Sequence, residues 1–253
     1  MSKRAFIAAA GLGTRLRPLT DTMPKALVPY GGIPLLERVI ERLKGAGYDE
    51  FVINIHHFAD QVEEFLSKRG DFGVRIMLSD ERDLLRETGG GIRHAAPILA
   101  DSPSGRFLVH NVDIITDLDL SWFDSLFGDS AEGGEDTGKH IADLFVTERK
   151  TARNLLFDSK MHLVGWINTE TSELRSPYPG LNPDECIRGA FGGIHNISAG
   201  ALKLMEGCPE RFSIIDFYLD NCRDFVVRGI MAPGVSVTDV GKAQNLITPS
   251  GTR

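Results

Sequence analysis

The sequence predicts an α/β protein built on a single, mostly parallel mixed sheet flanked by helices. Strand and helix patterns alternate through the first half of the chain, with short links between them. This alternation is typical of right-handed crossovers between parallel strands. At 253 residues, the chain can bury a sizeable core as one large domain or two small ones. A glycine turn follows the first strand, and ligands of such sheets bind beyond the carboxyl ends of the strands.

The first half should contain four strands separated by helices. The helix at 34–46 is indicated by apolar residues at helical spacing, with glycines after it to end it. The helix at 59–67 likewise has one apolar face, and a third helix is expected at 92–99. The strands are expected at 4–10, 51–55, 74–78 and 106–109.

The second half has a less regular pattern. A helix near 121–127 precedes an acidic, glycine-rich stretch at 128–140, which we expect to be a mobile, peripheral loop and not a domain boundary. Residues 155–157 and 163–167 predict a hairpin. Further strands are expected at 142–147, 191–196 and 225–230, and helices at 198–205 and 214–221.

Composition narrows the class of protein. The formal charge of −7 argues against a broad nucleic-acid surface, which needs clustered basic residues. No apolar run approaches the roughly 20 residues of a membrane-spanning helix, and the N-terminus lacks the pattern of a signal peptide. Three scattered cysteines predict neither a disulfide framework nor a metal site. We therefore expect a cytoplasmic protein with no nucleic-acid or membrane partner.

The turn after the first strand has the chemistry of an anion site. Gly11 and Gly13 allow backbone N–H groups to approach a ligand, and Thr14 adds a hydroxyl. Arg15, Arg17 and Lys25 bring three cations to the same stretch. This combination favours a polyphosphate, although a turn with a few solvated cations would be the simpler interpretation. Neither the Walker A pattern nor the dinucleotide fingerprint is present.

The whole stretch resembles a family signature. Gly11-Leu-Gly-Thr-Arg-Leu-Arg-Pro-Leu-Thr20, followed by Pro24-Lys25, is similar to the signature of sugar-1-phosphate nucleotidylyltransferases. The resemblance implies a Rossmann-like fold of the nucleotide-diphospho-sugar transferase type. It also implies that Arg15 and Lys25 are catalytic, contacting the nucleotide phosphates and the reacting phosphate, and that Ala9, Ala10, Gly11, Gly13 and Thr14 line the nucleotide. Arg17 matches a variable position and could be a surface charge only.

Two distant carboxylates complete the implied catalytic set. Asp113 lies in His110-Asn-Val-Asp-Ile-Ile-Thr-Asp117, where the family places a metal-binding Asp, usually after a glycine; here Val112 takes that place. Asp239 lies in Ser236-Val-Thr-Asp-Val-Gly241, which resembles the family segment that supplies the second metal ligand. The resemblance thus implies one Mg²⁺ between Asp113 and Asp239, with Asp113 also catalytic and Asn111 near the nucleotide. Alone, Asp113 could equally cap a turn.

Two further segments resemble the base and sugar sites of the family. Glu87-Thr-Gly-Gly-Gly-Ile92 is closest to short N-acetylmuramate-1-phosphate uridylyltransferases and near mannose- and heptose-1-phosphate guanylyltransferases. It implies base contacts from Glu87, Thr88 and Gly89, unless the glycines only form a flexible turn before a helix. Ala190-Phe-Gly-Gly-Ile194 implies a sugar site at Phe191, Gly192 and Gly193. Trp166 could stack on a sugar, but a core position is the more ordinary one for a tryptophan.

These resemblances imply a Mg²⁺-dependent enzyme that transfers a nucleoside monophosphate from a nucleoside triphosphate to a sugar 1-phosphate, giving a nucleotide sugar and pyrophosphate. UTP with an amino-sugar 1-phosphate is slightly favoured over GTP with mannose or heptose 1-phosphate. We expect residues 1–253 to form a single nucleotidyltransferase domain without a C-terminal β-helix domain, as a monomer or homodimer. Two alternatives stay open: an enzyme similar to phosphocholine cytidylyltransferase, and a catalytically inactive regulatory protein that binds nucleotide sugars.

Overall fold

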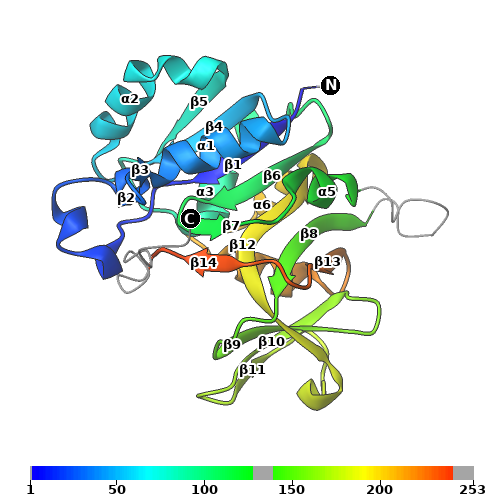
Figure 1. Cartoon of the computed structure of the whole chain (residues 1–253). Coiled ribbons are helices and arrows are strands. Elements are labelled where there is room, and N and C mark those ends of the chain that lie inside the picture. The colour runs from blue at the N-terminus through cyan, green and yellow to red at the C-terminus, as the bar shows by residue number, and fades with distance from the viewer. Residues whose placement is uncertain (1, 128–138, 242–253) are drawn as a thin grey trace.

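A ten-stranded mixed sheet forms the centre of the computed structural model, which describes residues 2–127 and 139–241. Its strands are β1 (Arg4–Ala8), β4 (Glu50–Ile55), β5 (Arg75–Asp80), β6 (Arg106–Asn111), β8 (His140–Thr147), β9 (Arg153–Phe157), β10 (Leu163–Asn168), β11 (Glu173–Arg175), β12 (Ile187–Ser198) and β13 (Val226–Met231). Their order is β11-β10-β9-β12-β6-β1-β4-β5, with β8 beside β12 and β13 beside β8 (Figure 1).

The sheet is parallel in the half formed by the first part of the chain. Strands β6, β1, β4 and β5 run parallel to one another. Strand β12 runs antiparallel to β6, β8 and β9, and β9 with β10 forms the predicted hairpin. Strands β9, β10 and β11 extend away from the parallel half, at the bottom of the view in Figure 1. The predicted mixed α/β fold is confirmed.

Helices cover both faces of the parallel strands because side chains along each strand alternate between the faces. In β1, Ala5 and Ile7 belong to one apolar cluster and Phe6 belongs to the other. The first cluster includes side chains of α1 (Leu35–Gly45), α2 (Ala59–Lys68) and α5 (Leu120–Ser125). The second includes side chains of α3 (Glu87–His94), α4 (Ala96–Leu99), α6 (Leu202–Met205) and α7 (Ile214–Asn221). The core is therefore two layers, one on each side of the sheet.

Two short strand pairs lie outside the main sheet. Strand β2 (Pro29–Tyr30) pairs with β3 (Ile33–Pro34), and β7 (Ile114–Thr116) pairs antiparallel with β14 (Val237–Asp239). The sequence analysis did not predict these pairs, because strands of two or three residues have no measurable periodicity. The β7–β14 pair joins residues more than a hundred positions apart.

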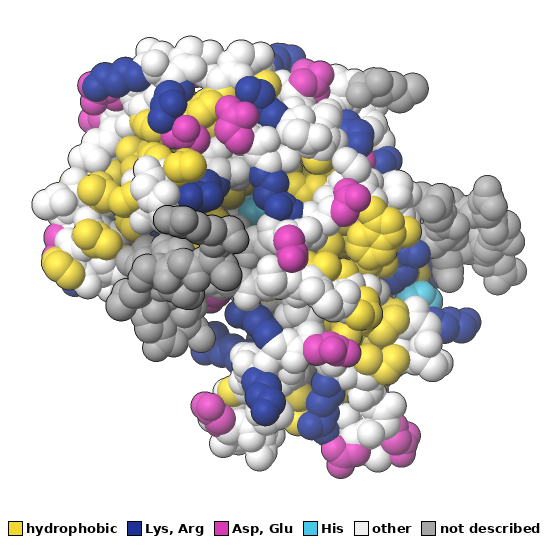
Figure 2. Space-filling model, viewed as in Figure 1, with side chains coloured by type: hydrophobic (Ala, Val, Ile, Leu, Met, Phe, Trp, Pro, Cys, Tyr) yellow, Lys and Arg dark blue, Asp and Glu magenta, His cyan; other side chains and the backbone are white. Residues whose placement is uncertain are grey.

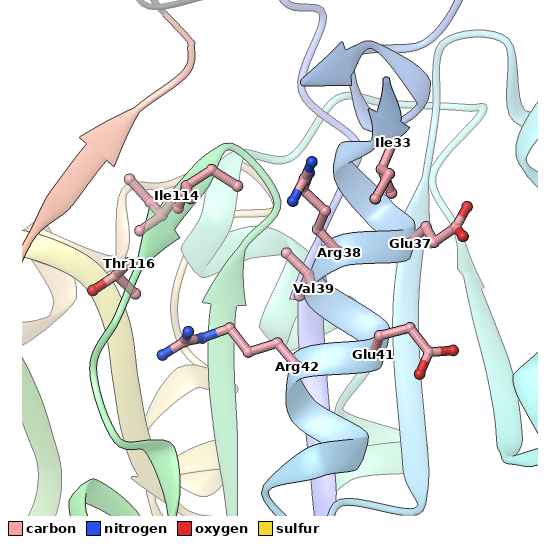
Figure 3. A pocket seen from close by; sticks show the side chains of 9 residues that line it. Ile33, Glu37, Arg38, Val39, Glu41, Arg42, Ile114 and Thr116 are labelled. Atoms are coloured by element: carbon pink, nitrogen blue, oxygen red, sulfur yellow. The ribbon is translucent and has the colours of Figure 1, made fainter. Parts of the chain in front are cut away.

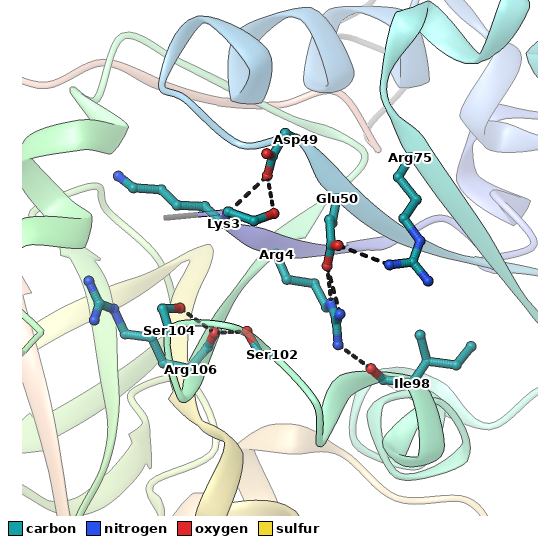
Figure 4. A network of polar contacts seen from close by, with 10 residues as sticks. Lys3, Arg4, Asp49, Glu50, Arg75, Ile98, Ser102, Ser104 and Arg106 are labelled. Atoms are coloured by element: carbon teal, nitrogen blue, oxygen red, sulfur yellow. Dashed lines mark hydrogen bonds and ion pairs between the residues drawn. The ribbon is translucent and has the colours of Figure 1, made fainter.

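Charged side chains hold the amino ends of the parallel strands together, at the end opposite to the glycine turn (Figure 4). The Arg4 side chain is buried and donates to Oε2 of Glu50 from Nη2 at 2.6 Å. Arg75 pairs with the other oxygen of Glu50 at 3.0 Å. Because a buried charge is costly without a partner, this network has a structural role, and it leaves the carboxyl ends of the strands for the site.

Two expectations about the elements need comment. The helix expected at 92–99 instead begins at Glu87, so the three glycines lie inside α3 rather than before it. Close packing against neighbouring segments, described below, explains glycine at these helical positions. The acidic loop expected at 128–140 falls mostly outside the described residues. In the described part of the chain, no helix has the length and apolar character needed to cross a bilayer.

Candidate functional site

The turn after β1 places Lys25 and Arg15 close to the carboxyl end of that strand. Gly13 has a φ of +62°, a left-handed conformation that favours glycine. A Cβ at Gly13 would lie 2.8 Å from Cγ2 of Thr20 and 3.0 Å from Cβ of Lys25. The glycine is therefore needed both for its backbone angle and for the close approach of Lys25. A 3₁₀ turn, Thr14–Leu16, follows directly and carries the exposed Arg15.

Lys25 and Asp113 form an ion pair between its ammonium Nζ and Oδ2 of the carboxylate. Both side chains are nearly buried, with 14% and 11% of their surfaces exposed. Lys25 begins the third 3₁₀ turn after β1, Lys25–Leu27, and Asp113 follows β6. Two residues that the sequence analysis assigned to catalysis are thus in direct contact. Arg17, by contrast, is exposed and pairs with Asp21, as a surface charge would.

The β7–β14 pair brings Asp239 to Asp113. Asp239 is opposite Ile114 in the register, and the N–H of Val240 donates to the Asp113 carbonyl oxygen at 2.9 Å. A Cβ at Gly241 would lie 2.5 Å from Oδ2 of Asp113, 2.9 Å from Oδ1 of Asp239 and 3.2 Å from Nη2 of Arg15. Two carboxylates and one guanidinium therefore surround one small space, which the absence of a side chain at Gly241 leaves open.

This arrangement suits a hard divalent cation. Mg²⁺ prefers oxygen ligands, takes few carboxylates from the protein and keeps several waters. The space beside Gly241 offers the oxygens of Asp113 and Asp239, and a Cβ would fill it. In residues 2–127 and 139–241, no group of three or more His, Cys, Asp or Glu side chains converges on a metal position. A cation here would thus have two protein carboxylates and would complete its shell with substrate oxygens or water.

The backbone amides at the start of the turn already have partners. Oδ1 of Asn54 accepts from the N–H of Ala9 at 2.6 Å and from that of Ala10 at 3.2 Å. Ala9 and Ala10 can therefore offer a nucleotide their surfaces or carbonyl groups, but not these N–H groups. Gly11, the next residue, is exposed.

The first turn of α3 packs tightly against the segment before α7. A Cβ at Gly89 would lie 2.5 Å from the ring of Phe212, and one at Gly90 would lie 2.3 Å from the carbonyl oxygen of Glu210. The Gly89 N–H also donates to the Phe212 carbonyl oxygen at 3.1 Å. These glycines are therefore explained by protein packing, which was neither of the two interpretations considered for them. Packing occupies the side of Gly89 where a side chain would lie, and its contact with a base stays a prediction.

Glu87 and Thr88 occupy the start of this helix. Glu87 has a φ of +61°, and its Oε1 accepts from Nε of Arg211 at 2.9 Å. Thr88 is partly exposed. Neither side chain lines the cavity described below. Their role at the base stays a prediction.

The strand β12 links the predicted sugar residues to Asn111. A Cβ at Gly192 would lie 2.4 Å from the Phe145 ring, so Gly192 packs against the core. Gly193 has a φ of +76°, and a Cβ there would lie 2.6 Å from Ile114 and 3.2 Å from Nδ2 of Asn111. The Asn111 Oδ1 is buried without a hydrogen-bond partner in the described part of the chain. Phe191 is half-buried and contacts the His195 ring at 5.3 Å between centroids.

One cavity of about 970 Å³ joins the catalytic candidates to the β9–β11 strands. Arg15, Asp239 and Phe191 line one part of it, and Trp166, Arg175 and Asp216 line another. Its other lining residues are Arg149, Lys150, Thr151, Ala152, Arg153, Leu155, Asn168, Glu170, Glu173, Ser213 and Ile215. Figure 2 shows Lys and Arg side chains, interspersed with Asp and Glu, over this lower part of the molecule. Five Arg or Lys side chains and four Asp or Glu side chains line this cation-rich cavity, so it is polar with a small excess of positive charge.

Several of these lining residues were not singled out from the sequence. Arg149, Lys150 and Arg153 follow the strand β8 closely, and a run of cations after a buried strand was the signal that could have identified them. Trp166 was assigned preferentially to the core, but its half-buried ring lines the cavity, with the Arg175 guanidinium 5.9 Å from the ring centroid. Asn54 carried no sequence signal at all, because a single Asn at the end of a strand is common.

A second, smaller pocket of about 340 Å³ lies between α1 and β7 (Figure 3). Arg38 and Arg42 of α1 and Ile114 of β7 line it, together with Thr116 and the exposed Ile33. None of its lining residues belongs to the cation-rich cavity. We assign no role to it in the reaction.

Two histidines near the site are buried and uncharged. Burial lowers the pKa of His110 to about 4 and that of His195 to about 3. His195 Nδ1 lies 2.6 Å from the hydroxyl of Tyr218, which can donate to it. Neither ring can act as a proton acceptor near neutral pH without opening of the core, so both are structural.

Comparisons with known proteins are consistent with this site. The family described as nucleotidyl transferase matches residues 4–141. An N-acetylmuramate alpha-1-phosphate uridylyltransferase of Caulobacter vibrioides is 47% identical over 115 residues, which are 45% of this chain and 46% of the relative. A mannose-1-phosphate guanyltransferase of Gibberella zeae is 36% identical over 137 residues, 53% of this chain and 36% of the relative. The matched part thus spans about half of the first relative and about a third of the second.

Solved structures match nearly the whole chain at low identity. HddC from Yersinia pseudotuberculosis, complexed with GMP-PN, has a TM-score of 0.70 at 20% identity, covering 96% of each chain. A putative glucose-1-phosphate thymidylyltransferase from Bacillus anthracis has a TM-score of 0.75 at 18% identity, covering 97% of this chain and 92% of that one. Likeness at this identity shows the fold, and the family match covers more than half of the chain. This chain belongs to the nucleotidyl transferase family.

Proposed function

We propose that this chain is a Mg²⁺-dependent sugar-1-phosphate nucleotidylyltransferase. The observation that carries the proposal is the meeting of Arg15, Lys25, Asp113 and Asp239. Two of them, Arg15 and Asp239, line the cation-rich cavity. Those four groups supply opposite charges at one place, as the transfer of a charged phosphoryl group requires. The names of the N-acetylmuramate and mannose relatives support the same class of reaction.

In the proposed reaction, a phosphate oxygen of the sugar 1-phosphate attacks the α-phosphorus of the nucleoside triphosphate. A new P–O bond forms there, the bond from the α-phosphorus to the bridging oxygen breaks, and pyrophosphate leaves with that electron pair. The acceptor is already anionic, so no general base is required. The buried, neutral rings of His110 and His195 are consistent with a reaction that needs no general base.

Each charged group has a distinct task in this scheme. Arg15 offers a planar fork to the phosphate oxygens of the nucleotide, and Lys25 offers a compact charge beside the reacting phosphate. Asp113 and Asp239 would hold Mg²⁺, which when bound neutralises the triphosphate and aligns it for displacement. Before substrate binds, the Lys25 ammonium offsets the charge of Asp113.

The cavity has cations that can bind an acceptor with a second acidic group. Arg149, Lys150, Arg153 and Arg175 all line it, in addition to Arg15. Glu170, Glu173 and Asp216 line it too, and Asp216 pairs with Arg175, so the excess of positive charge is small. The stronger support for N-acetylmuramate 1-phosphate, which carries a carboxylate besides its phosphate, is the 47% identity to an N-acetylmuramate alpha-1-phosphate uridylyltransferase. We therefore place UTP with N-acetylmuramate 1-phosphate ahead of GTP with mannose or heptose 1-phosphate. The alternative acceptor, phosphocholine, would find Glu170, Glu173 and Trp166 in the same lining for its cationic end, so the acceptor panel below tests it directly.

The decisive experiment measures pyrophosphate release across four nucleoside triphosphates and a panel of acceptors. The panel includes N-acetylmuramate, N-acetylglucosamine and mannose 1-phosphates and phosphocholine. Turnover should require Mg²⁺ and should be abolished by Asp113→Asn and by Asp239→Asn, with nearly unchanged thermal stability. Turnover with phosphocholine alone would support the cytidylyltransferase alternative. Nucleotide-sugar binding without turnover for any pair would support an inactive regulatory protein.

A further inference from the structure

A buried polar pair lies directly beneath the glycine turn. Asn54 is the penultimate residue of the strand β4, and only 4% of the residue is exposed. Its side-chain oxygen accepts from the N–H groups of both Ala9 and Ala10. One side chain of β4 thus fixes two consecutive peptide groups at the point where β1 ends and the turn begins.

The other half of the pair is a carboxylate with no exposure to solvent. Glu81 directly follows β5 and is 0% exposed. Nδ2 of Asn54 donates to its Oε1 at 2.7 Å, and the Arg86 N–H donates to its Oε2 at 3.3 Å. Burial raises the pKa of the Glu81 carboxyl, and the bonds from Asn54 and Arg86 act against that shift. Such a buried carboxylate is costly unless both oxygens are bonded.

The same pair is in contact with α3. A Cβ at Gly91 would lie 2.7 Å from Oε1 of Glu81 and 3.0 Å from Nδ2 of Asn54. Helix α3 can therefore lie against the pair only because residue 91 has no side chain. One end of this hydrogen-bonded chain holds the turn that carries the phosphate-binding candidates, and the other supports the helix that begins with Glu87 and Thr88.

We infer that Asn54 and Glu81 are positioning residues for the nucleotide, which hold the turn after β1 and the start of α3 in one fixed relation. The identity of the ligand rests on the proposed function. The pair itself touches neither phosphate nor base. It acts by keeping the turn after β1 and the start of α3 at a fixed distance from each other. The conformational entropy of these two segments is then lost when the protein folds and not when the nucleotide binds.

A purely structural role makes a different prediction. Val52, two residues before Asn54 and on the same face of β4, is buried and apolar, so a polar pair is not needed to fill space on this face. If the pair only satisfied its own hydrogen bonds, replacing it would lower stability and leave ligand affinities in the folded protein unchanged. If it positions the turn, nucleotide affinity should fall while the affinity for the sugar phosphate is retained.

The test compares Asn54→Ala and Glu81→Gln with the unaltered protein. Calorimetry with UTP and with GTP gives Kd, and steady-state kinetics give KM for each substrate separately. Asn54→Ala should raise the nucleotide Kd and KM by about tenfold or more, because two backbone donors lose their acceptor. The KM of the sugar phosphate should change less than about threefold. Glu81→Gln leaves one acceptor oxygen for two donors and should give a smaller effect in the same direction.

Tyr218→Phe is the matched control. It removes another buried hydrogen bond of the same length, 2.6 Å, between Tyr218 and His195, away from the turn. It should lower the melting temperature without changing the nucleotide Kd. A double variant, Asn54→Ala with Glu81→Gln, should weaken nucleotide binding by less than the product of the two single effects, because the two side chains bond to each other.

Amide hydrogen exchange supplies a readout at the turn itself. The N–H groups of Ala9 and Ala10 should lose protection in Asn54→Ala and keep it in Tyr218→Phe. The inference is overturned if Asn54→Ala lowers the melting temperature as Tyr218→Phe does but leaves the nucleotide Kd within twofold. If the protein binds a nucleotide tightly but turns over no acceptor, the proposed function is refuted. The inference about Asn54 and Glu81 can then still be tested by the nucleotide Kd. A protein that binds no nucleotide would refute both.

Discussion

The ammonium of Lys25 contacts the Asp113 carboxylate across a sequence separation of 88 residues. The first residue comes from the turn after β1 and the second from the end of β6, its neighbour in the sheet. Parallel strands that lie side by side end at the same edge, so the contact is a direct result of the βαβ arrangement. The pair places a positive charge where a phosphate would bind and a negative charge where a metal would bind.

Lys25→Met should lower kcat by about 10²–10³-fold, since it removes a fixed charge that faces the reacting phosphate. Methionine keeps the length and the apolar stem of lysine, but it leaves the Asp113 carboxylate without its ion-pair partner, so the melting temperature should fall and is measured alongside. Steady-state pyrophosphate release is the measurement. The control is Lys68→Met, which removes an exposed lysine of α2 paired with Glu64 and should leave kcat unchanged. A loss smaller than tenfold in Lys25→Met, with the fold intact, would remove Lys25 from the reaction.

Gly241→Ala should cost activity because the new methyl group would occupy the space between Asp113 and Asp239. We expect turnover to fall by about tenfold or more and the Mg²⁺ concentration for half-maximal rate to rise, since the two carboxylates must move apart. A titration of rate against Mg²⁺ measures both effects. Gly207→Ala is the control, because nothing lies within 4 Å of a Cβ there. Equal Mg²⁺ dependence in the two variants would place the metal elsewhere.

Much of this site could be predicted from the sequence, but its geometry could not. The turn after β1 and the strand before Asp113 were predictable because a glycine signature and buried strands have clear local patterns. The meeting of Asp113 with Asp239 depends on β7 and β14, three residues each, which have no local signal. The glycines of α3 were interpreted wrongly for a different reason. Their sequence suggested a turn before a helix, but they lie within the helix, where close packing against Phe212 and Glu210 leaves no room for a side chain.

Arg175→Met should raise the KM of the sugar 1-phosphate by about tenfold with little change in the KM of the nucleotide. Arg175 lines the cavity beside Trp166 and pairs with Asp216 at 2.8 Å, so it is held where an anionic acceptor would lie. Charged hydrogen bonds of this kind are worth about 1.5–3 kcal/mol each. Arg188→Met, which breaks the exposed pair with Asp184, is the control. If both KM values rise together, Arg175 supports the fold of the β9–β11 strands and does not bind the acceptor.

The stability of the protein should fall as the pH drops from about 6.5 toward 4, in part through His195. Burial lowers the pKa of this ring to about 3, so the folded protein keeps it neutral. The unfolded chain takes up a proton near pH 6.5, so protons favour unfolding below that value, by about 1.4 kcal/mol per pH unit. Between pH 7 and pH 5, the free energy of unfolding should therefore fall by about 2 kcal/mol less in His195→Gln than in the unaltered protein. Urea unfolding at both pH values measures this difference. His110, whose pKa is lowered to about 4, should remain responsible for a similar loss in both proteins. An equal pH dependence of the two unfolding free energies would mean that His195 takes up its proton at the same pH in the folded and the unfolded protein.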